Sequence, residues 1–312
     1  MKYFQSIFKL NRSLRASRID IRPPVPSIGR TGLSIVAIFK NEEKYIADWI
    51  RFHAIAGVRD FIFYDNGSTD ATVEIIHSFS MLNIRIIPWV LDTSAHKPKM
   101  VLPRQILAYC HAISNFGSIY RWMAFIDIDE YLVPETEKSI ADCLASLDGF
   151  SNISLPWVMF GHSGHEVPPT IPVPLAYTMR ATQQSGALLN FKCIVDPCDV
   201  RQVSTHKFET IGMGSKSSNA AGEIMSNKAR MSPAFITSAG LQLNHYYLRS
   251  RLEMQQKISG SAVSGTDHEK RKNSILEKAV LIEKDLVTDR SALKFLARHG
   301  ISSQSDFEEF CL

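Results

Sequence analysis

Apolar and polar positions follow two alternating periods along the first part of the chain. Residues 33–39 form a continuous apolar run rich in β-branched side chains, which predicts a buried strand. Residues 41–56 instead carry apolar side chains at helical spacing, and Gly57 provides a stop for that helix. Phe61–Tyr64 predicts a second strand, followed by a helix that reaches about Phe79. Strands that alternate with helices favour a parallel sheet with helices on both faces.

The same alternation continues down the chain. Further strands are expected at residues 83–87, 122–132 and 153–160, and further helices at 102–115, 248–258, 269–286 and 291–298. The Gly-, Ser-, Asn- and Ala-rich stretch at 208–232 predicts a mobile or disordered loop. We therefore predict the α/β fold class, with a leader over residues 1–31, one domain over 32–260 and a C-terminal helical appendage over 261–312.

The segment with the clearest chemical content is the apolar run that ends in Asp127-Ile-Asp129-Glu130. If the strand stays extended, Asp127 and Asp129 point to the same face, because neighbours along a strand alternate. Paired carboxylates at the C-terminal end of a buried strand suit a hard divalent cation and the phosphates that it binds. Three grouped acids are costly unless something positive binds there. The alternative is an acidic turn exposed to solvent.

A second acidic segment, Asp65-Asn66-Gly-Ser-Thr-Asp70, follows the second predicted strand. An ordinary turn explains it, since Asn-Gly permits positive φ and a hydroxyl can cap the next helix. An acid at this place in a doubly wound sheet can also bind ribose hydroxyls or a base N–H. Because both acidic segments follow predicted parallel strands, we expect Asp65 and Asp127 to line one crevice. The glycine fingerprints of dinucleotide and P-loop sites are missing from the sequence.

Three further residues are candidates because of their local patterns. Glu166 lies in a Gly- and Pro-rich segment after an apolar strand pattern and is the candidate general base, with Asp196 and Asp199 as rivals. Lys192 lies in an apolar strand pattern, where an amine needs an anion or a path to solvent. His245 precedes a basic helical pattern, and imidazole is a competent ligand for Mn²⁺. A plain loop carboxylate at Glu166 and a buried structural imidazole at His245 are the alternatives.

Composition describes a globular chain with a large core. The 312 residues are 45% hydrophobic, and no apolar run approaches the roughly 20 residues of a membrane-spanning helix. No secretory signal with a cleavage site is visible. The five cysteines are an odd and scattered set, which is typical of reduced thiols and predicts a cytoplasmic protein.

The net charge of +4 is unevenly distributed. Residues 1–30 carry seven basic side chains against Asp20 alone, a net charge of +6, so the remainder carries −2 and does not favour nucleic acid. Within residues 1–22, the apolar side chains from Tyr3 to Leu14 lie on one side of a helical projection and basic ones lie opposite, as in helices that lie on anionic membranes. This predicts peripheral contact with the inner face of a membrane, with a disordered basic leader as the alternative.

An ordered set of motifs carries a resemblance to known enzymes. The set is Ser34–Glu43, Trp49…His53, Gly57-Val58, Tyr64–Asp70, Phe125–Leu132, Trp157–Gly161, Phe191–Ile194 with His206, and Asn244-His245-Tyr246. In this order the motifs resemble GT-A-fold glycosyltransferases of the family 2-like and family 92-like groups, over roughly residues 32–260. The resemblance implies a mixed, mostly parallel sheet flanked by helices.

The resemblance also implies a function and roles for residues. It implies transfer of a sugar from a nucleotide-sugar donor to a glycan or lipid-linked acceptor, typically with inversion, and with Mn²⁺ or Mg²⁺ as cofactor. The metal would be bound by Asp127, Asp129 and His245. The nucleotide-sugar would meet Asp65, Asn66, Asp70, Asp127 and Lys192.

Two other classes of function stay open at the level of sequence. An apolar run ending in Asp-x-Asp also resembles the nucleophile strand of haloacid-dehalogenase-type, Mg²⁺-dependent phosphatases and phosphotransferases. Those enzymes have it on their first strand, followed by Thr or Val, whereas here it lies late and is followed by Glu130. A sugar-binding protein without catalytic activity is the other alternative.

Overall fold

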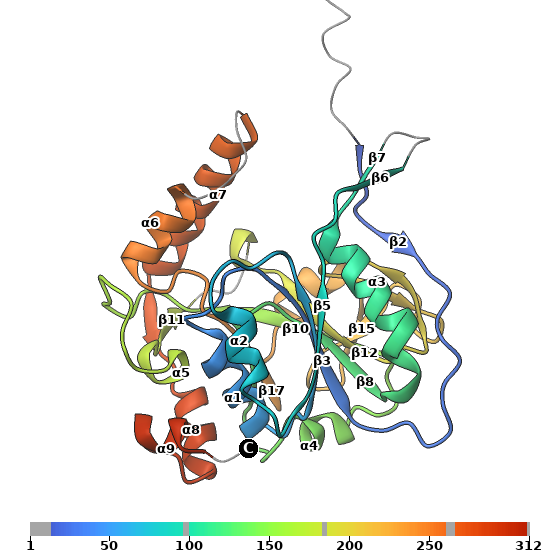
Figure 1. The fold of residues 1–312 in the computed structure, drawn as a ribbon, viewed down its shortest axis with the longest axis horizontal. Helices are drawn as coiled ribbons and strands as arrows, with labels where there is room; N and C mark the ends of the chain where they lie inside the picture. The colour runs from blue at the N-terminus through green and yellow to red at the C-terminus, as the bar shows by residue number, and fades with distance from the viewer. Residues whose placement is uncertain (1–13, 96–99, 183–185, 260–265, 311–312) are drawn as a thin grey trace, which may run out of the picture.

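A ten-stranded mixed sheet organises the molecule (Figure 1). The computed structural model describes residues 14–95, 100–182, 186–259 and 266–310. The main path of the sheet runs β16 (Ile224–Ser226), β15 (Lys216–Ser218), β10 (Asn152–Met159), β12 (Phe191–Val195), β8 (Trp122–Phe125), β3 (Leu33–Phe39), β4 (Asp60–Asp65) and β5 (Asn83–Pro88). Off this path, β17 (Leu241–His245) pairs with β10 and with β9 (Glu130–Pro134). The predicted α/β class with a mixed, mostly parallel sheet is confirmed.

The parallel part of the sheet has a doubly wound order. Strands β5, β4, β3 and β8 are neighbours and all run parallel, so the third, second, first and fourth strands of the body lie side by side. The chain then turns back, because β12 pairs with β8 in the antiparallel direction. The carboxyl ends of β3, β4 and β8 therefore meet at one edge, where ligands of such sheets bind.

Alternate side chains of the central strands enter two separate cores. Along β3, Ile35 and Ala37 pack with α1 (Ile46–Ile55), whereas Val36 faces α3 (Arg104–Phe116) on the other side. This is the consequence of the two-residue period of a strand that is buried on both faces. Figure 1 shows α1 and α2 (Thr72–His77) to one side of β3 and α3 to the other.

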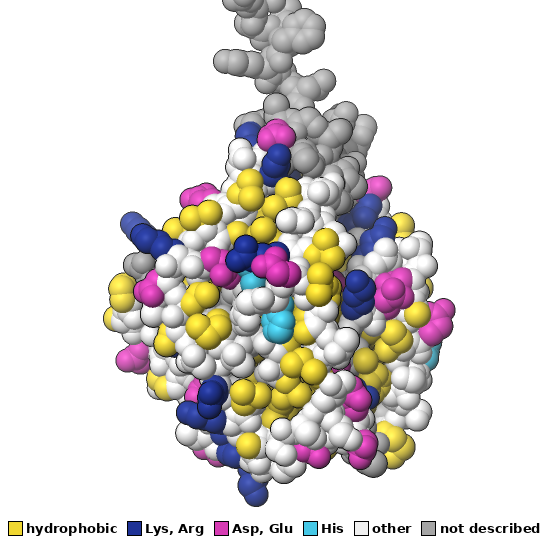
Figure 2. All heavy atoms as spheres, turned by 90° about the vertical axis from the view of Figure 1, so that its left-hand side faces the viewer, with side chains coloured by type: hydrophobic (Ala, Val, Ile, Leu, Met, Phe, Trp, Pro, Cys, Tyr) yellow, Lys and Arg dark blue, Asp and Glu magenta, His cyan; other side chains and the backbone are white. Residues whose placement is uncertain are grey.

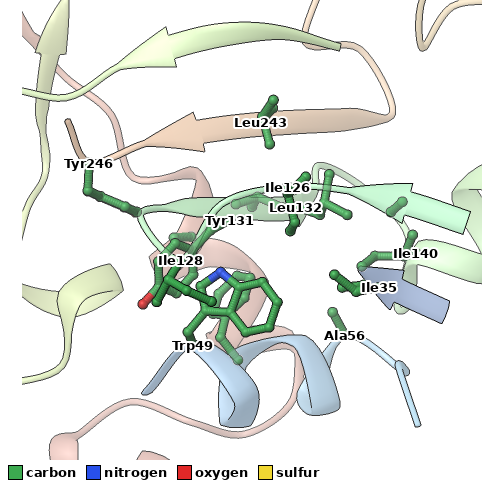
Figure 3. Close-up of a cluster of buried hydrophobic side chains, with 14 of the residues drawn as sticks. Ile35, Trp49, Ala56, Ile126, Ile128, Tyr131, Leu132, Ile140, Leu243 and Tyr246 are labelled. Carbon is green, nitrogen blue, oxygen red and sulfur yellow. The ribbon is translucent and has the colours of Figure 1, made fainter. Parts of the chain in front are cut away.

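One aromatic side chain links α1 to the strand that follows the carboxylates. The Trp49 indole is fully buried, and its Nε1 donates to the backbone oxygen of Glu130 at 2.8 Å. Figure 3 shows Trp49 beneath Ile128, Tyr131 and Leu132 in the same apolar cluster. The helical spacing seen in the sequence therefore supports the segment that carries the acids.

The N-terminal segment belongs to the body from residue 14 onward. Strand β1 (Leu14–Arg15) pairs with β7 (Met100–Leu102), and β2 (Ile19–Asp20) pairs with β13 (Val200–Val203). The predicted boundary at residue 31 thus falls inside a segment that is paired with the rest of the protein. Most of the predicted amphipathic leader, residues 1–13, lies outside the described residues and stays a prediction. Among the described residues, no helix is long and apolar enough to cross a membrane.

Residues 208–232, predicted as a mobile loop, are built into the structure. They form β14 (Phe208–Thr210), β15, β16 and short 3₁₀ turns, and β15 pairs with β10 at the edge of the main sheet. Arg230 anchors the segment, since its fully buried guanidinium donates to Ser154 Oγ and to the backbone oxygen of His206. The segment has few apolar residues, so its sequence pattern did not predict these strands or their contacts with distant residues.

The C-terminal helices share the main core. The chain continues through α7 (Thr266–Glu283), β18 (Leu286–Thr288), α8 (Ser291–Arg298) and α9 (Gln304–Glu308). The side chains of Ile282, Phe295 and Phe307 are buried in the same cluster as Trp49. Strand β18 also pairs with β11 (Met179–Ala181). The predicted appendage is therefore packed against the domain that precedes it.

The face shown in Figure 2 carries acidic and basic side chains next to one another. Strong attraction for a polyanion needs a basic patch or stripe of one sign. The mixed pattern on this face gives no support to nucleic-acid binding there.

A bidentate ion pair fastens the N-terminal segment to the sheet. Both Arg30 guanidinium nitrogens donate to the two Asp196 oxygens at 2.6 Å, and Arg121 also reaches Asp196 at 3.2 Å. All three side chains are largely buried. Removing Asp196 would leave two arginines without this carboxylate.

We predict that Asp196→Ala lowers the free energy of unfolding by about 2–4 kcal/mol, because breaking a largely buried pair leaves charges uncompensated. Urea unfolding of the full chain measures this. The matched control is Arg201→Ala, which breaks a more exposed pair with Glu209 and should cost less than about 1 kcal/mol. Equal effects of the two variants would contradict the tethering role of Asp196.

Candidate active site

A large cavity of about 1380 Å³ opens at the carboxyl ends of the central strands. Its floor includes Asp127 and Asp129, and Asn66, Asp70 and Gln105 also line it. One wall comes from α6 (Arg251–Ser259) and α7, and the opposite wall comes from the hairpin of β6 (Thr93–Ala95) and β7. Figure 1 shows these two projections on opposite sides of the upper end of the molecule. The cavity therefore lies where the doubly wound order predicts a ligand.

The two aspartates do not share a face, because the strand ends before them. Strand β8 stops at Phe125, and a turn closed by the Glu130 N–H on the Asp127 carbonyl at 3.1 Å leads into β9. The expected extended geometry is thus replaced by a turn. Asp127 and Asp129 consequently have different partners.

A buried ammonium group, on a neighbouring strand of the sheet, pairs with Asp127. Lys192 Nζ on β12 lies 2.8 Å from Asp127 Oδ2, and Gln105 Nε2 donates to Oδ1 at 2.9 Å. Lys192 is fully buried. Burial disfavours its ammonium form, but the carboxylates of Asp127 and Glu130 outweigh this and raise the pKa of Lys192 above the usual value. Lys192 therefore serves as the counter-ion of Asp127.

Glu130 is the buried centre of the same network. Its Oε2 accepts from the Asp127 N–H at 2.7 Å, its Oε1 accepts from Trp157 Nε1 at 2.7 Å, and Lys192 Nζ lies 3.6 Å away. Burial raises the pKa of Glu130, and Lys192 opposes that rise. Since both carboxylate oxygens already accept hydrogen bonds, Glu130 holds the turn in place.

Asp129 faces histidine and lysine on the other side of the turn. His245 Nε2 lies 3.4 Å and Lys257 Nζ 3.7 Å from Asp129 Oδ2. Burial alone would raise the pKa of Asp129, but His245, Lys257 and Arg249 outweigh it and hold the pKa well below the usual value. Burial lowers the pKa of His245, whereas the adjacent Asp129 raises it, and the neutral imidazole is the form that can bind a metal.

The residues around Asp129 fit a divalent cation. Asp129, Glu130 and His245 each offer a ligand atom within 4.8 Å of the others. His245 is almost fully buried, and its Nδ1 has no hydrogen-bond partner among the described residues. An oxygen and an imidazole nitrogen together suit Mn²⁺ or Mg²⁺ with water in the remaining positions. Of the predicted ligands, Asp129 and His245 lie together, whereas Asp127 is paired with Lys192.

The second acidic segment is joined to the loop after β3. Asp65 Oδ1 accepts from the Ser68 N–H at 2.8 Å, and Asp70 accepts from the backbone of Thr72 and Glu43. Gly67 has φ +81, and an added Cβ there would lie 2.9 Å from Val90. The positive φ expected at the glycine is therefore present, but no hydroxyl among the described residues caps α2, whose N-cap residue is Ala71. Asn66 and Asp70 line the cavity, whereas Asp65 serves the turn.

The three candidate bases lie outside this cavity. Glu166 is exposed and pairs with Arg251 at 3.2 Å. Asp196 holds Arg30 in the bidentate ion pair, and Asp199 Oδ2 accepts from the Gly212 N–H at 2.9 Å. Among the residues that the structure describes, none of the three lines the cavity with Asp129.

Two charged residues in the cavity were not singled out from the sequence. Arg249 adopts φ 53, stacks over the Tyr45 ring at 3.6 Å and lies 3.5 Å from Glu42. A side chain other than glycine in the left-handed region costs free energy and tends to persist at functional sites. Burial raises the pKa of Glu42, which Arg249 opposes. No local sequence pattern marks either contact, since more than 200 residues separate the partners.

The arrangement combines a candidate cation site, buried positive charges and a half-buried carboxylate around one cavity. Such a set can hold a diphosphate, offset charge on a leaving phosphate and accept a proton from a hydroxyl. These are the requirements of group transfer from an activated phosphate ester.

Curated relatives are similar over part of the chain. A glycosyltransferase family 92 protein of Ricinus communis is 24% identical over 156 residues, which are 47% of this chain and 26% of the relative. A family 92 protein of Oryza sativa is 23% identical over 155 residues, covering 47% and 24% of the two chains. The matched part thus spans about a quarter of these longer relatives.

Solved structures show weaker likeness. Staphylococcus aureus TarS, residues 1–349, matches at 17% identity and a TM-score of 0.35, over 80% of this chain and 71% of TarS. Glucosyl-3-phosphoglycerate synthase from Mycobacterium tuberculosis, with Mn²⁺ and UDP-glucose bound, matches at 18% identity and 0.30, over 54% and 57%. Both TM-scores lie below 0.5, so membership of a family rests on sequence.

The decisive match is to a family model. The model described as glycosyltransferase family 92 covers residues 33–232, which is well over half of the chain and includes Asp127, Asp129 and Lys192. The chain belongs to glycosyltransferase family 92.

Proposed function

We propose that the protein transfers a sugar from a nucleotide-sugar donor to a hydroxyl of a glycan or lipid-linked acceptor. The observation that carries the proposal is the pairing of Asp129, which lines the cavity, with the buried His245 in a family 92 chain. The donor would lie over the carboxyl ends of β3, β4 and β8, with its nucleoside between Asn66 and Gln105. Contact with a membrane through residues 1–22 remains part of this proposal.

Asp129 and His245 would hold Mn²⁺ or Mg²⁺, and the ion would offset negative charge on the departing diphosphate. Asp127, fixed by Lys192, presents a partly exposed carboxylate to the same space and suits a hydroxyl of the donor. Arg249 and Lys257 add positive charge next to Asp129, where the leaving phosphates would lie.

Glu42 is the base that the geometry supports best for inverting transfer. It lines the cavity, is half-buried and meets Arg249 through Oε2. Among the described residues, Glu42 Oε1 has no hydrogen bond. A raised pKa brings a carboxylate closer to the operating pH, which favours general-base catalysis. Glu166, the base expected from the sequence, would have to move from its exposed position to reach the same hydroxyl.

We predict that Asp129→Asn lowers turnover at least about 100-fold and removes the rise in melting temperature that Mn²⁺ gives the wild type, because a ligand oxygen is lost. Donor hydrolysis and thermal shifts of the full chain, with Mn²⁺ or EDTA, measure this. Wild-type turnover in the variant or in EDTA would contradict the metal site.

The same variant tests the electrostatics of the turn. The pKa of Asp129 is depressed in the fold, so its carboxylate stabilises the protein above the usual aspartate pKa and this contribution fades as pH falls. Asp129→Asn should therefore melt below the wild type at neutral pH, with a smaller difference in acid. A gap that is constant with pH would argue against this depression.

We predict that Glu42→Gln lowers kcat at least about 100-fold, whereas Glu166→Gln stays within about threefold of the wild type. In the wild type, kcat/KM should fall as pH drops through the raised pKa of Glu42, because the protonated acid cannot accept a proton. Initial rates measured as a function of pH, with Glu42→Gln beside the wild type, test this. Loss of turnover in Glu166→Gln alone would return the role of base to Glu166.

A further inference from the structure

The acidic and basic side chains that line the cavity differ in how many of them have a hydrogen-bond or ion-pair partner within the protein. Seven carboxylates line it, and each has a hydrogen bond or ion pair within the protein: Glu42, Glu43, Asp70, Asp92, Asp127, Asp129 and Glu253. Seven cations also line it, and three of them, Arg104, Arg249 and Lys257, have such partners. Among the described residues, the side chains of four show no hydrogen bond or ion pair, are exposed and line the cavity: Arg15, Lys40, Lys44 and Arg271.

Two of these free cations lie on the side of α6 and α7. Lys44 precedes Tyr45, whose hydroxyl binds Glu253 on α6, and its charge acts on Glu253. Arg271 on α7 is close enough to Tyr247 and Lys257 for its charge to act on both. This places Lys44 and Arg271 on the wall next to Asp129.

This wall lies opposite the place proposed for the nucleoside. Asn66 directly follows β4, and Gln105 lies in the first turn of α3; both line the cavity. The family match ends at residue 232, before α6 and α7 begin. The cavity of about 1380 Å³ exceeds the roughly 300–1,000 Å³ of single-ligand pockets, so it has room for a second molecule beside a donor.

We propose that Lys44 and Arg271 bind an anionic group, a phosphate or carboxylate, on the acceptor. The proposal rests on the proposed function and names the chemical class of its acceptor. Free cations in a cavity whose carboxylates are all engaged attract an anion and disfavour another cation. Arg271 lies on α7, beyond the family match, whereas Lys44 lies within it. The part of this wall that α7 contributes would therefore set acceptor specificity for this chain.

A binding experiment separates the acceptor from the donor. The full chain is first saturated with Mn²⁺ and the nucleoside diphosphate, UDP or GDP, that raises its melting temperature more. Glucose 6-phosphate and glucose are then titrated as a matched charged and neutral pair. We expect glucose 6-phosphate to bind at least about tenfold more tightly than glucose, and the difference to shrink with added salt.

The double variant Lys44→Gln, Arg271→Gln should weaken glucose 6-phosphate about tenfold and leave the affinity for the nucleoside diphosphate unchanged. The control is Lys207→Gln, an exposed lysine outside the cavity, which should change neither affinity. Equal binding of the two sugars, or no binding of either, overturns the proposal. A loss of nucleoside diphosphate affinity in the double variant would assign the two cations to the donor instead. If neither nucleotide stabilises the wild type, the proposed function itself fails.

Discussion

The site depends on one buried ion pair network around Lys192. Its ammonium group is almost fully excluded from water and lies 2.8 Å from Asp127 and 3.6 Å from Glu130. A charge in this position is tolerated only because two carboxylates surround it, and those carboxylates in turn require the lysine. Because Lys192 is on β12 and the acids follow β8, the antiparallel pairing of these strands sets the position of the turn that carries the acids.

The network gives the adjacent acids different partners and different roles. Glu130 is buried and engaged through both oxygens, so it fixes the backbone of the turn. Asp129 is thereby left pointing toward His245, and β17 brings that histidine into register with Glu130. Three neighbouring acids thus have three distinct environments: a paired one, a ligand-like one and a structural one. Repulsion among them is relieved by this separation.

Local patterns predicted much of the fold but few of the partners. The strand at 33–39 has the expected bounds, and the Asn66-Gly turn has the expected positive φ at Gly67. The strand from Trp122 ends earlier than its apolar pattern indicated. In the turn that follows, Asp127 is paired with Lys192, which is distant in sequence. Arg249 belongs to the basic pattern after His245, but its stacking on Tyr45 had no local signal, since this contact arises only in the folded chain. The local sequence pattern shows where strands, helices and acidic residues lie. Which basic residues pair with those acids is decided by the tertiary structure.

The boundary of the family match coincides with a change in the role of the cavity walls. Within residues 33–232 lie the strand ends, Asp127, Asp129 and their supporting lysine. His245, Arg249 and Lys257 come from beyond it, yet they complete the surroundings of Asp129. Residues 14–15 of the N-terminal segment likewise bring Arg15 to the opposite rim. A chain shortened to the matched region would therefore keep the carboxylates but lose the His245 imidazole and the cations that balance them. Asp129 would then lack both the positive charges that hold it as an anion and the imidazole that could bind a metal beside it.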